Sequence, residues 1–261
     1  MKKAIWVVLA IFLAGGLAAY FLVPPEVPPP PPPPAQREIP RAAKPAVAEV
    51  AAPKILHPLR GVPAASLPAP DASDDPLLKA LGAALGHRWL AYIVGDDLIS
   101  RIVAMVDNLP REKLPTGLMP LKRLPKSFVA VGKGAARSIG TGNSARYAAY
   151  VRLVGALDAE KLVAVYVQFY PLFQRAYEDL GSSNGYFNDR LVVAIDDLLA
   201  APEPTTPIRL VRPMLHHEFA DPTLEARSAG QKIMLRMGRD HAVAVKAKLR
   251  EIRRLVASDA G

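Results

Sequence analysis

The chain has 261 residues, no cysteine, 27 prolines and a formal net charge of +9 at pH 7. Its apolar content is too high for a disordered protein and its proline content is too high for one compact domain, so we expect separate segments. The absence of cysteine excludes disulfides, thiolate metal sites, cysteine nucleophiles and a lipoprotein anchor.

The N-terminal segment is hydrophobic. Lys2 and Lys3 precede an uncharged apolar run over residues 4–23, which spans roughly 30 Å as a helix and so crosses a bilayer once. A cleaved signal peptide is the alternative, because residues 16–18 offer small side chains at a cleavage position, but the apolar run continues beyond the usual signal-peptide length. We therefore predict a transmembrane anchor over residues 1–23 that contacts the membrane through residues 4–23.

The orientation of this anchor follows from its charge. The positive-inside rule holds Lys2 and Lys3 in the cytoplasm, so the rest of the chain lies on the other side of the membrane. In a bacterium that side is the periplasm. The predicted location is thus the bacterial inner membrane, with a cytoplasmic N-terminus and most of the chain in the periplasm.

Residues 24–70 are rich in proline, which occupies 16 of these 47 positions. Proline has a fixed φ and no N–H donor, so we expect a disordered or polyproline II linker that acts as a semi-rigid spacer with a reach on the order of 145 Å. A polyproline ligand for a partner's aromatic groove is the alternative, although a plain proline run lacks the spacing of such ligands.

The remaining segment, residues 71–261, carries 26 Lys/Arg and 21 Asp/Glu. This mild excess suits anionic lipid or cell-wall polymer as a partner, but it is too small for a nucleic-acid-binding surface, and we predict no nucleic-acid partner. The length fits one compact domain.

Helical periodicity dominates this domain, and we predict a mostly α, α+β fold with one or two short β-hairpins. The expected helices cover residues 73–86, 96–110, a segment that opens near 142, and 159–181, 185–202, 222–237 and 240–256. Short strand pairs are expected within 127–139 and within 208–219. Three prolines in residues 111–125 forbid a long element, so we expect an ordered surface segment there.

The longest predicted helix begins after Asp158 and ends at Gly181, with a kink before Pro171. Its aromatic stripe indicates the buried central helix of the domain rather than a ligand groove. The stripe consists of Leu162, Tyr166, Phe169, Phe173 and Tyr177.

Nucleotide and nucleophile motifs receive no support. Residues 140–145 have the form G-x-G-x-x-A, but a dinucleotide site needs a βαβ unit, whereas here a helix follows a helix. No G-x-S-x-G elbow, S-x-x-K pair or P-loop occurs. We predict no cofactor and assign no catalytic residue.

The stretch "LHHEFADP", residues 215–222, is close to the H-E-x-x-H pattern of zinc peptidases. His217 and Asp221 would have to share a helical turn, yet Pro222 favours Asp221 as a helix N-cap. In a strand, adjacent histidines point in opposite directions. We therefore predict no metal site, a cap at Asp221, and a strand that brings Glu218 towards Arg190 or Arg236.

Polar residues on the predicted helix 185–202 form the best candidate cluster. We expect Asn188 to cap this helix, which places Arg190 in the first turn, where the helix dipole disfavours a cation. Arg190 therefore predicts an acidic partner, either Asp197, Glu218 or Asp107, with an anion clamp as the functional alternative. The full candidate cluster consists of Asp107, Asn188, Asp189, Arg190, Glu218, Gln231 and Arg236.

The last predicted helix is basic. Its apolar face carries Val245, Leu249, Ile252 and Val256, and its cations lie largely elsewhere. Cations near a helix C-terminus are favoured by the dipole and need no ligand, while a membrane-surface or polymer contact is the alternative.

Three stretches together resemble a bacterial domain family of unknown function, numbered 3014. They are "DNLP" at 107–110, "GYFNDRLVVAIDDLLAAP" at 185–202, and "EFADPTLEARSAGQKIMLRMG" from residue 218, followed by "VKAKLREIRRL". The resemblance implies a membrane span, a proline-rich spacer and one C-terminal domain, with no assigned reaction. It also implies an aromatic residue at the position of His217, so this histidine is a departure from the family pattern.

Two functions are compatible with these features. The first is a single-pass inner-membrane protein that presents a non-catalytic periplasmic domain to envelope proteins or to an anionic cell-wall polymer. The alternative is a cell-envelope hydrolase that uses carboxylates around one cleft, with Asp107, Asp189, Arg190 and Glu218 as its polar residues. The two differ in whether these side chains converge in an open cleft or pair off below the surface.

Overall fold

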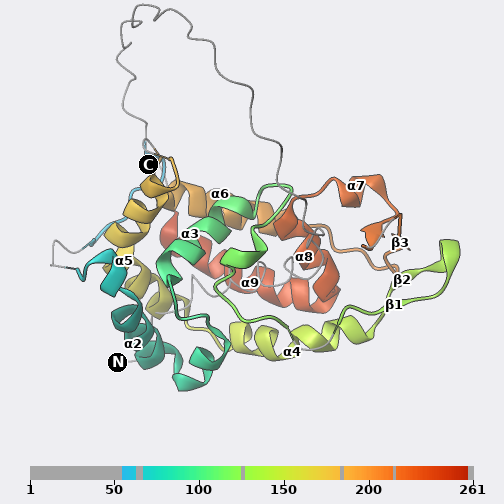
Figure 1. Ribbon diagram of the computed structural model, residues 1–261, viewed down its shortest axis with the longest axis horizontal. Helices are drawn as coiled ribbons and strands as arrows, with labels where there is room; N and C mark the ends of the chain where they lie inside the picture. Colours follow the sequence, from blue (N-terminus) through green and yellow to red (C-terminus); the bar gives the residue numbers. More distant parts are fainter. Residues whose placement is uncertain (1–54, 63–66, 125–126, 183–184, 214–215, 258–261) are drawn as a thin grey trace, which may run out of the picture.

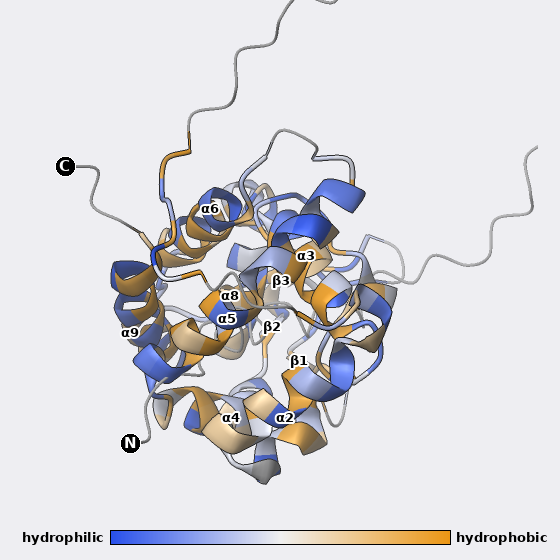
Figure 2. Cartoon of the chain, turned by 90° about the vertical axis from the view of Figure 1, so that its left-hand side faces the viewer, coloured by the Kyte–Doolittle hydropathy of each residue, from blue (hydrophilic) through white to orange (hydrophobic). Residues whose placement is uncertain are grey.

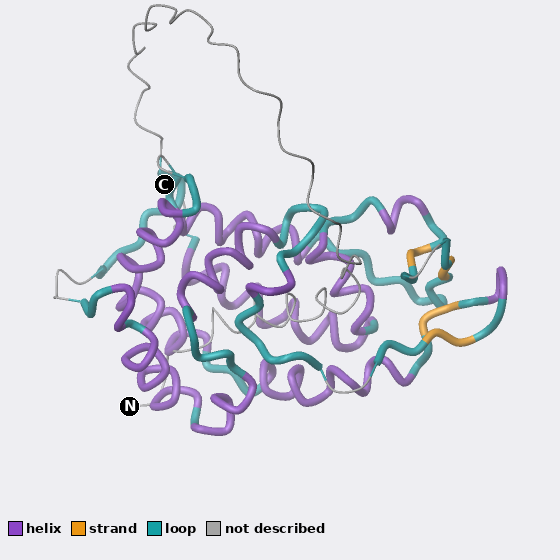
Figure 3. The backbone as a smooth tube through the Cα atoms, viewed as in Figure 1, coloured by secondary structure: helices purple, strands orange, loops and turns teal. Residues whose placement is uncertain are grey.

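The computed structural model describes residues 55–62, 67–124, 127–182, 185–213 and 216–257. Most of these residues are helical, and the strands gather at one end of the molecule (Figure 3). The predicted mostly helical fold with two short strand pairs is confirmed. The predicted anchor and most of the spacer lie outside the described residues, and within the described part of the chain no helix is long and apolar enough to cross a membrane.

The elements follow one another along the chain as Figure 1 labels them. The α-helices are α2 Asp74–Leu85, α3 Leu98–Asn108, α4 Gly142–Gly155, α5 Ala159–Asp179, α6 Phe187–Leu199, α7 Pro222–Glu225, α8 Ala229–Met237 and α9 Arg239–Val256. Short 3-10 helices are η2 Pro70–Ala72, η3 His87–Tyr92, η4 Thr116–Leu118 and η5 Gly134–Ala136. The strands β1 Ala130–Val131 and β2 Ser138–Ile139 pair antiparallel, as do β3 Leu210–Val211 and β4 Glu218–Phe219.

Two helices lie at the centre of the packing. α9 packs against α4, α5, α6 and α8, and its predicted apolar face, which includes Val245, Leu249 and Ile252, is buried. The predicted central helix 159–181 corresponds to α5, which packs against α2, α3, α6 and α9 and exposes one side to solvent.

The aromatic stripe of α5 is nevertheless core. All five stripe residues are buried, and Tyr166, Phe173 and Phe187 pack together with ring centroids 5.5–6.3 Å apart. The helix runs through Pro171, which is exposed on its outer side. The other helices also carry both hydrophobic and hydrophilic residues (Figure 2), and most of their large apolar residues are buried.

The predicted helix 222–237 is in fact two helices. α7 ends at Glu225, and α8 starts after Ser228, whose side chain accepts a hydrogen bond from Gln231 N. The Ser228 hydroxyl also donates to Asp197 on α6 over 2.6 Å. The expectation of one continuous helix was wrong because this cap satisfies the N–H groups of a new helix whose start is fixed against α6.

The proline-containing segment after α3 contributes to the core. It has no long element, as predicted, but Leu114, Met119 and Leu121 are buried. The segment is therefore more than a surface connection, since its apolar side chains close one side of the bundle.

The folded part of the chain extends into the expected spacer. Leu59, Val62 and Leu67 pack against the core, and the backbone of residues 56–59 bonds to α6 and the residue before it. We call residues 55–62 the strap. Figure 1 shows it beside the C-terminal end of α9.

Candidate functional site

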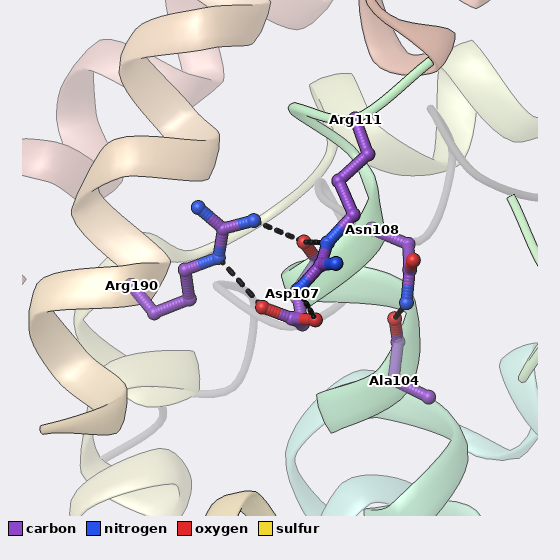
Figure 4. Close-up of polar contacts among 5 residues, drawn as sticks. All are labelled: Ala104, Asp107, Asn108, Arg111 and Arg190. Carbon is purple, nitrogen blue, oxygen red and sulfur yellow. Dashed lines mark hydrogen bonds and ion pairs between the residues drawn. The ribbon is translucent and has the colours of Figure 1, made fainter. Parts of the chain in front are cut away.

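The candidate polar residues do not form one site but separate into pairs and small networks. The first pair joins α6 to the C-terminal end of α3 (Figure 4). Arg190 Nε lies 2.9 Å from Asp107 Oδ1, and an Arg190 Nη donates to the Asp107 carbonyl oxygen. Arg111 approaches the other carboxylate oxygen at 2.6 Å.

This geometry explains the unfavourable position of Arg190 on its own helix. Its guanidinium reaches the C-terminal end of α3, where carbonyl groups carry partial negative charge and favour a cation. The partner is Asp107, one of the three acids that the sequence offers. Both side chains are largely buried, so the pair is an internal strut and is not open to a ligand.

Asn188 does not cap α6. The N-cap residue is Tyr186, and Asn188 lies fully buried in the first turn. Its Nδ2 donates to His57 O at 2.7 Å and to Val256 O at 2.8 Å, and its Oδ1 accepts from Tyr166 at 3.2 Å. The amide therefore joins the strap, α5, α6 and the end of α9, a role that a cap residue facing solvent could not fill.

Asp189 faces the strap. Its two carboxylate oxygens accept from the backbone N–H groups of Leu56 and His57, at 3.0 and 2.7 Å. Both carboxylate oxygens therefore accept hydrogen bonds from backbone N–H groups, and Asp189 is not paired with another acidic residue of the described chain.

Gln231 belongs to a third network, at the start of α8. Its Nε2 donates to the carbonyl and to the carboxylate of Asp197, at 3.0 and 2.9 Å. Burial raises the pKa of the Asp197 carboxyl, while the hydrogen bonds from Ser228 and Gln231 oppose that shift. Asp197 thus bonds to α8 and is not the ion-pair partner of Arg190.

The C-terminal end of α3 meets the N-terminal end of α8 at this junction. Ala229 N donates to Arg111 O at 2.7 Å, and Gly230 N donates to Leu109 O at 2.9 Å. A Cβ added at Gly230 would lie 2.8 Å from a Leu198 methyl and 3.1 Å from Leu109 O. A larger residue at this position would require Leu198 and Leu109 to shift, so glycine suits the close approach of the two backbones.

Glu218 reaches neither Arg190 nor Arg236, so this expectation was wrong. Strand alternation buries Phe219 and leaves Glu218 exposed, without a side-chain hydrogen bond or ion pair to any described residue. Glu225 has the role expected of Glu218, since it accepts from Phe219 N and from Lys232, at 2.8 and 2.7 Å. Arg236 lies over the Phe219 ring at 5.3 Å, and burial lowers its pKa.

Within the "LHHEFADP" stretch, Glu218 and Phe219 form β4, and Asp221 caps α7. Asp221 is the N-cap of α7 and accepts from Thr223 N at 2.8 Å, which lowers the Asp221 pKa. The His217 ring lies 5.7 Å from the Phe128 ring, and desolvation lowers its pKa. Among the described residues, no three His, Asp or Glu side chains gather as metal ligands would.

The basic face of α9 is largely neutralised. Lys246 is buried and bonds to Glu203 and to Ala201 O, both at 2.6 Å. Lys248 bonds to Glu251 and to Leu157 O, and Arg253 pairs with Asp196. Three of the cations that suggested a lipid-facing helix therefore bind acids of the same domain.

A concave surface lies at the first turn of α9. A cleft of about 350 Å³ lies between the start of α4, the proline-rich loop 202–208 and the joint between α8 and α9. Its polar lining includes Thr141, Ser144, Thr205, Arg236, Arg239 and His241. We call it the α4–α9 cleft.

Two helices begin at this cleft. Neither α4 nor α9 has a side-chain cap at its N-terminus, and Gly238 (φ +89°) makes the sharp joint that starts α9. A Cβ added at Gly238 would lie 3.5 Å from Ser144 Cβ, so the two helix starts adjoin. Uncapped N–H groups and positive dipole ends add to the charge of the two arginines there, against one acid, Asp240.

Sequence reasoning missed this cleft, although one signal was present. The G-x-G-x-x-A motif at residues 140–145 lies at this cleft, because Gly140 and Thr141 line it and the uncapped α4 begins at Gly142. The nucleotide interpretation of this motif fails here as expected, because α4 is followed by α5 and not by a strand. Loop 202–208 carries no motif, and its place opposite α4 depends on long-range packing.

Comparison with known proteins gives a family but no function. The family model described as "Protein of unknown function (DUF3014)" matches residues 98–253, which run from the start of α3 almost to the end of α9. No curated protein and no solved structure matches the chain significantly. Since the match covers more than half of the sequence, the chain belongs to the DUF3014 family.

Proposed function

We propose that this protein is a single-pass inner-membrane protein whose periplasmic domain binds an anionic group, carried by an envelope protein or a cell-wall polymer, in the α4–α9 cleft. The observation that supports the proposal is the cleft itself. It is open and concave, and it places Arg236 and Arg239 beside backbone donors of two helix starts. Such a surface favours carboxylate or phosphate groups.

The rest of the chain supports a tethered role. An apolar run over residues 4–23 and a proline-rich spacer from residue 24 suit a domain held at a distance from a membrane. Reach of this kind is useful to a binding domain, since a tether raises the local concentration of the domain near its ligand.

The hydrolase alternative receives less support from the geometry. It needs carboxylates that face each other in an open cleft, with a separation suited to acid–base work. Instead, Asp107 pairs with two arginines, Asp189 binds backbone N–H groups, and Glu218 is exposed away from both. Among the described residues, Asp240 is the one acid that lines the α4–α9 cleft.

The binding proposal can be tested with full-length protein in detergent micelles and purified peptidoglycan, a carboxylate-bearing polymer, as the probe. Co-sedimentation should fall at least about tenfold for Arg239→Glu, which reverses a charge in the cleft, and should weaken with salt. Arg254→Glu is the matched control, because it makes the same charge change at the far, exposed end of α9.

Equal losses for the two variants would place binding outside the cleft. If peptidoglycan does not bind, crosslinking of the full-length protein in envelope extracts tests the protein-partner arm with the same two variants. Failure in both arms would refute the proposal. The topology is tested separately by a reporter fused after Gly261, and activity of a reporter that works only in the cytoplasm would contradict a periplasmic domain.

A further inference from the structure

The strap is attached to the folded domain through hydrogen bonds of its backbone as well as through its apolar side chains. Three residues at the start of α6, namely Tyr186, Asn188 and Asp189, hold it, and we call them the clamp. Asp189 accepts from two successive N–H groups, and the Tyr186 hydroxyl accepts from Leu59 N at 3.1 Å. Asn188 donates to His57 O at 2.7 Å. Four hydrogen bonds thus hold the backbone of three strap residues, Leu56, His57 and Leu59.

The clamp has a defined position relative to the α4–α9 cleft. The second amide hydrogen of Asn188 bonds to Val256 O, the last residue of α9, whereas the cleft is lined by Gly238 and Arg239 at the first turn of α9. With 18 residues, α9 is about 27 Å long. The strap and the strand pairs beside the cleft lie at opposite ends of the molecule in Figure 1.

We infer that the clamp fixes the point at which the tether joins the folded domain, and that it keeps this point at the end of the domain opposite the α4–α9 cleft. This inference rests on the proposed function, since orientation matters only for a tethered domain that binds in its cleft. With the strap held, the spacer predicted from the sequence is residues 24–54, for which a polyproline II chain gives a reach of roughly 95 Å. Release of the strap would add up to about 25 Å to this reach and would move the attachment point relative to the cleft.

The chain is well suited to a direct test, because it contains no cysteine. Spin labels are attached to full-length protein through Arg60→Cys in the strap and Val211→Cys at the cleft end, both at exposed positions. Distances between the labels are measured by pulsed electron spin resonance in micelles. A clamped strap gives one narrow distance distribution.

Two variants open the clamp from opposite sides. Asp189→Ala removes the acceptor of two strap N–H groups, and His57→Pro removes one of those donors from the strap itself. Each should broaden the distribution, and Asp189→Ala should reduce the protection of the Leu56 and His57 amides from hydrogen exchange by about tenfold or more. Asp196→Ala is the matched control, since Asp196 lies on α6 but bonds to Arg253.

The inference is overturned if both clamp variants keep the narrow distribution, or if the unsubstituted chain already shows a broad one. Because no ligand is present, the result is independent of the binding experiment. A failed peptidoglycan or crosslinking test would refute the cleft as a binding site and leave the clamp intact, whereas a broad distribution in the unsubstituted chain would refute the clamp alone.

Discussion

At the residue scale, Asn188 joins segments that lie far apart in the sequence. Its side chain is fully buried and bonds to His57 O, Val256 O and the Tyr166 hydroxyl. The two carbonyl groups need a donor, which an amide supplies and a carboxylate does not. The hydrogen-bonding groups of asparagine, as well as its size, are therefore required at this position.

Asn188→Ala should lower the free energy of unfolding by about 2–4 kcal/mol, because it leaves buried polar groups without partners. Asn188→Asp should be at least as harmful despite its nearly identical shape, since it places a carboxylate against two carbonyl oxygens. Urea denaturation followed by circular dichroism measures both. Asn108→Ala, which removes only a bond to Ala104 O within α3, is the control and should cost less than about 1 kcal/mol. A neutral Asn188→Asp would contradict this account.

His217 gives the fold a pH dependence. Desolvation and the nearby Arg212 and Arg137 lower its pKa, so the folded protein holds it neutral while the unfolded chain binds a proton more readily. Stability through this residue is therefore present above the unfolded pKa of about 6.5 and is lost as the pH falls below it.

His217→Phe should keep the contact with Phe128 and remove this contribution. We compare the melting temperature of the variant with that of the unsubstituted protein at each pH. The difference, variant minus unsubstituted protein, should be larger at pH 5 than at pH 8. Thermal melts at the two pH values check the difference. An identical gap at both would show that His217 does not titrate on unfolding.

At the element scale, α8 depends on one residue that links it to α6. Ser228 caps the helix through Gln231 N at 3.1 Å and donates to Asp197 at 2.6 Å. Ser228→Ala should destabilise the domain by about 1–3 kcal/mol, because it loses the cap and leaves a partly buried carboxylate short of a donor. Chemical denaturation measures the loss. Ser100→Ala, at an exposed position within α3, should change stability by less than about 0.5 kcal/mol.

Local patterns predicted most of these elements. The end of α2 follows from Gly86 and the start of α5 from Asp158, and the β1–β2 pair follows from its valines and the glycines between the strands. The break before α8 was missed, although Ser228 and Gln231 have the spacing of a capping box. Helical periodicity continues through this region, and the partner that fixes the break, Asp197, lies 31 residues earlier.

The candidate site was less predictable for the same reason. The sequence predicted an acidic partner for Arg190 but could not choose Asp107, which lies 83 residues away. The strap had no sequence signal, because α6 and the residue before it bind its backbone, and the sequence separations are 127 residues or more. Backbone N–H groups are the same in almost every residue, so such contacts leave little trace in side-chain patterns.

At the scale of the whole molecule, the folded unit is larger than the family match. Residues before position 98 supply Leu77, Leu81 and Trp89 to the core, and Leu59 of the strap packs on its surface. A chain that starts at residue 71 should be less stable than one that starts at residue 55, by about 3 kcal/mol, since it loses apolar contacts and clamp hydrogen bonds.

Urea midpoints of the two chains measure this difference, and a chain that starts at residue 24 is the control. If the predicted spacer acts only as a spacer, the chains from 24 and from 55 should unfold at the same midpoint. Equal midpoints for the chains from 55 and from 71 would show that the strap contributes nothing to stability.

The position of α9 between the strap and the α4–α9 cleft has a mechanical consequence. Tension in the tether would pull on the clamp at the last turn of α9, and a ligand held in the cleft would pull on its first turn. The load would then run along the axis of the helix that packs against α4, α5, α6 and α8. Unfolding under this load would require α9 to slide along all four neighbouring helices at once, instead of separating from them one at a time.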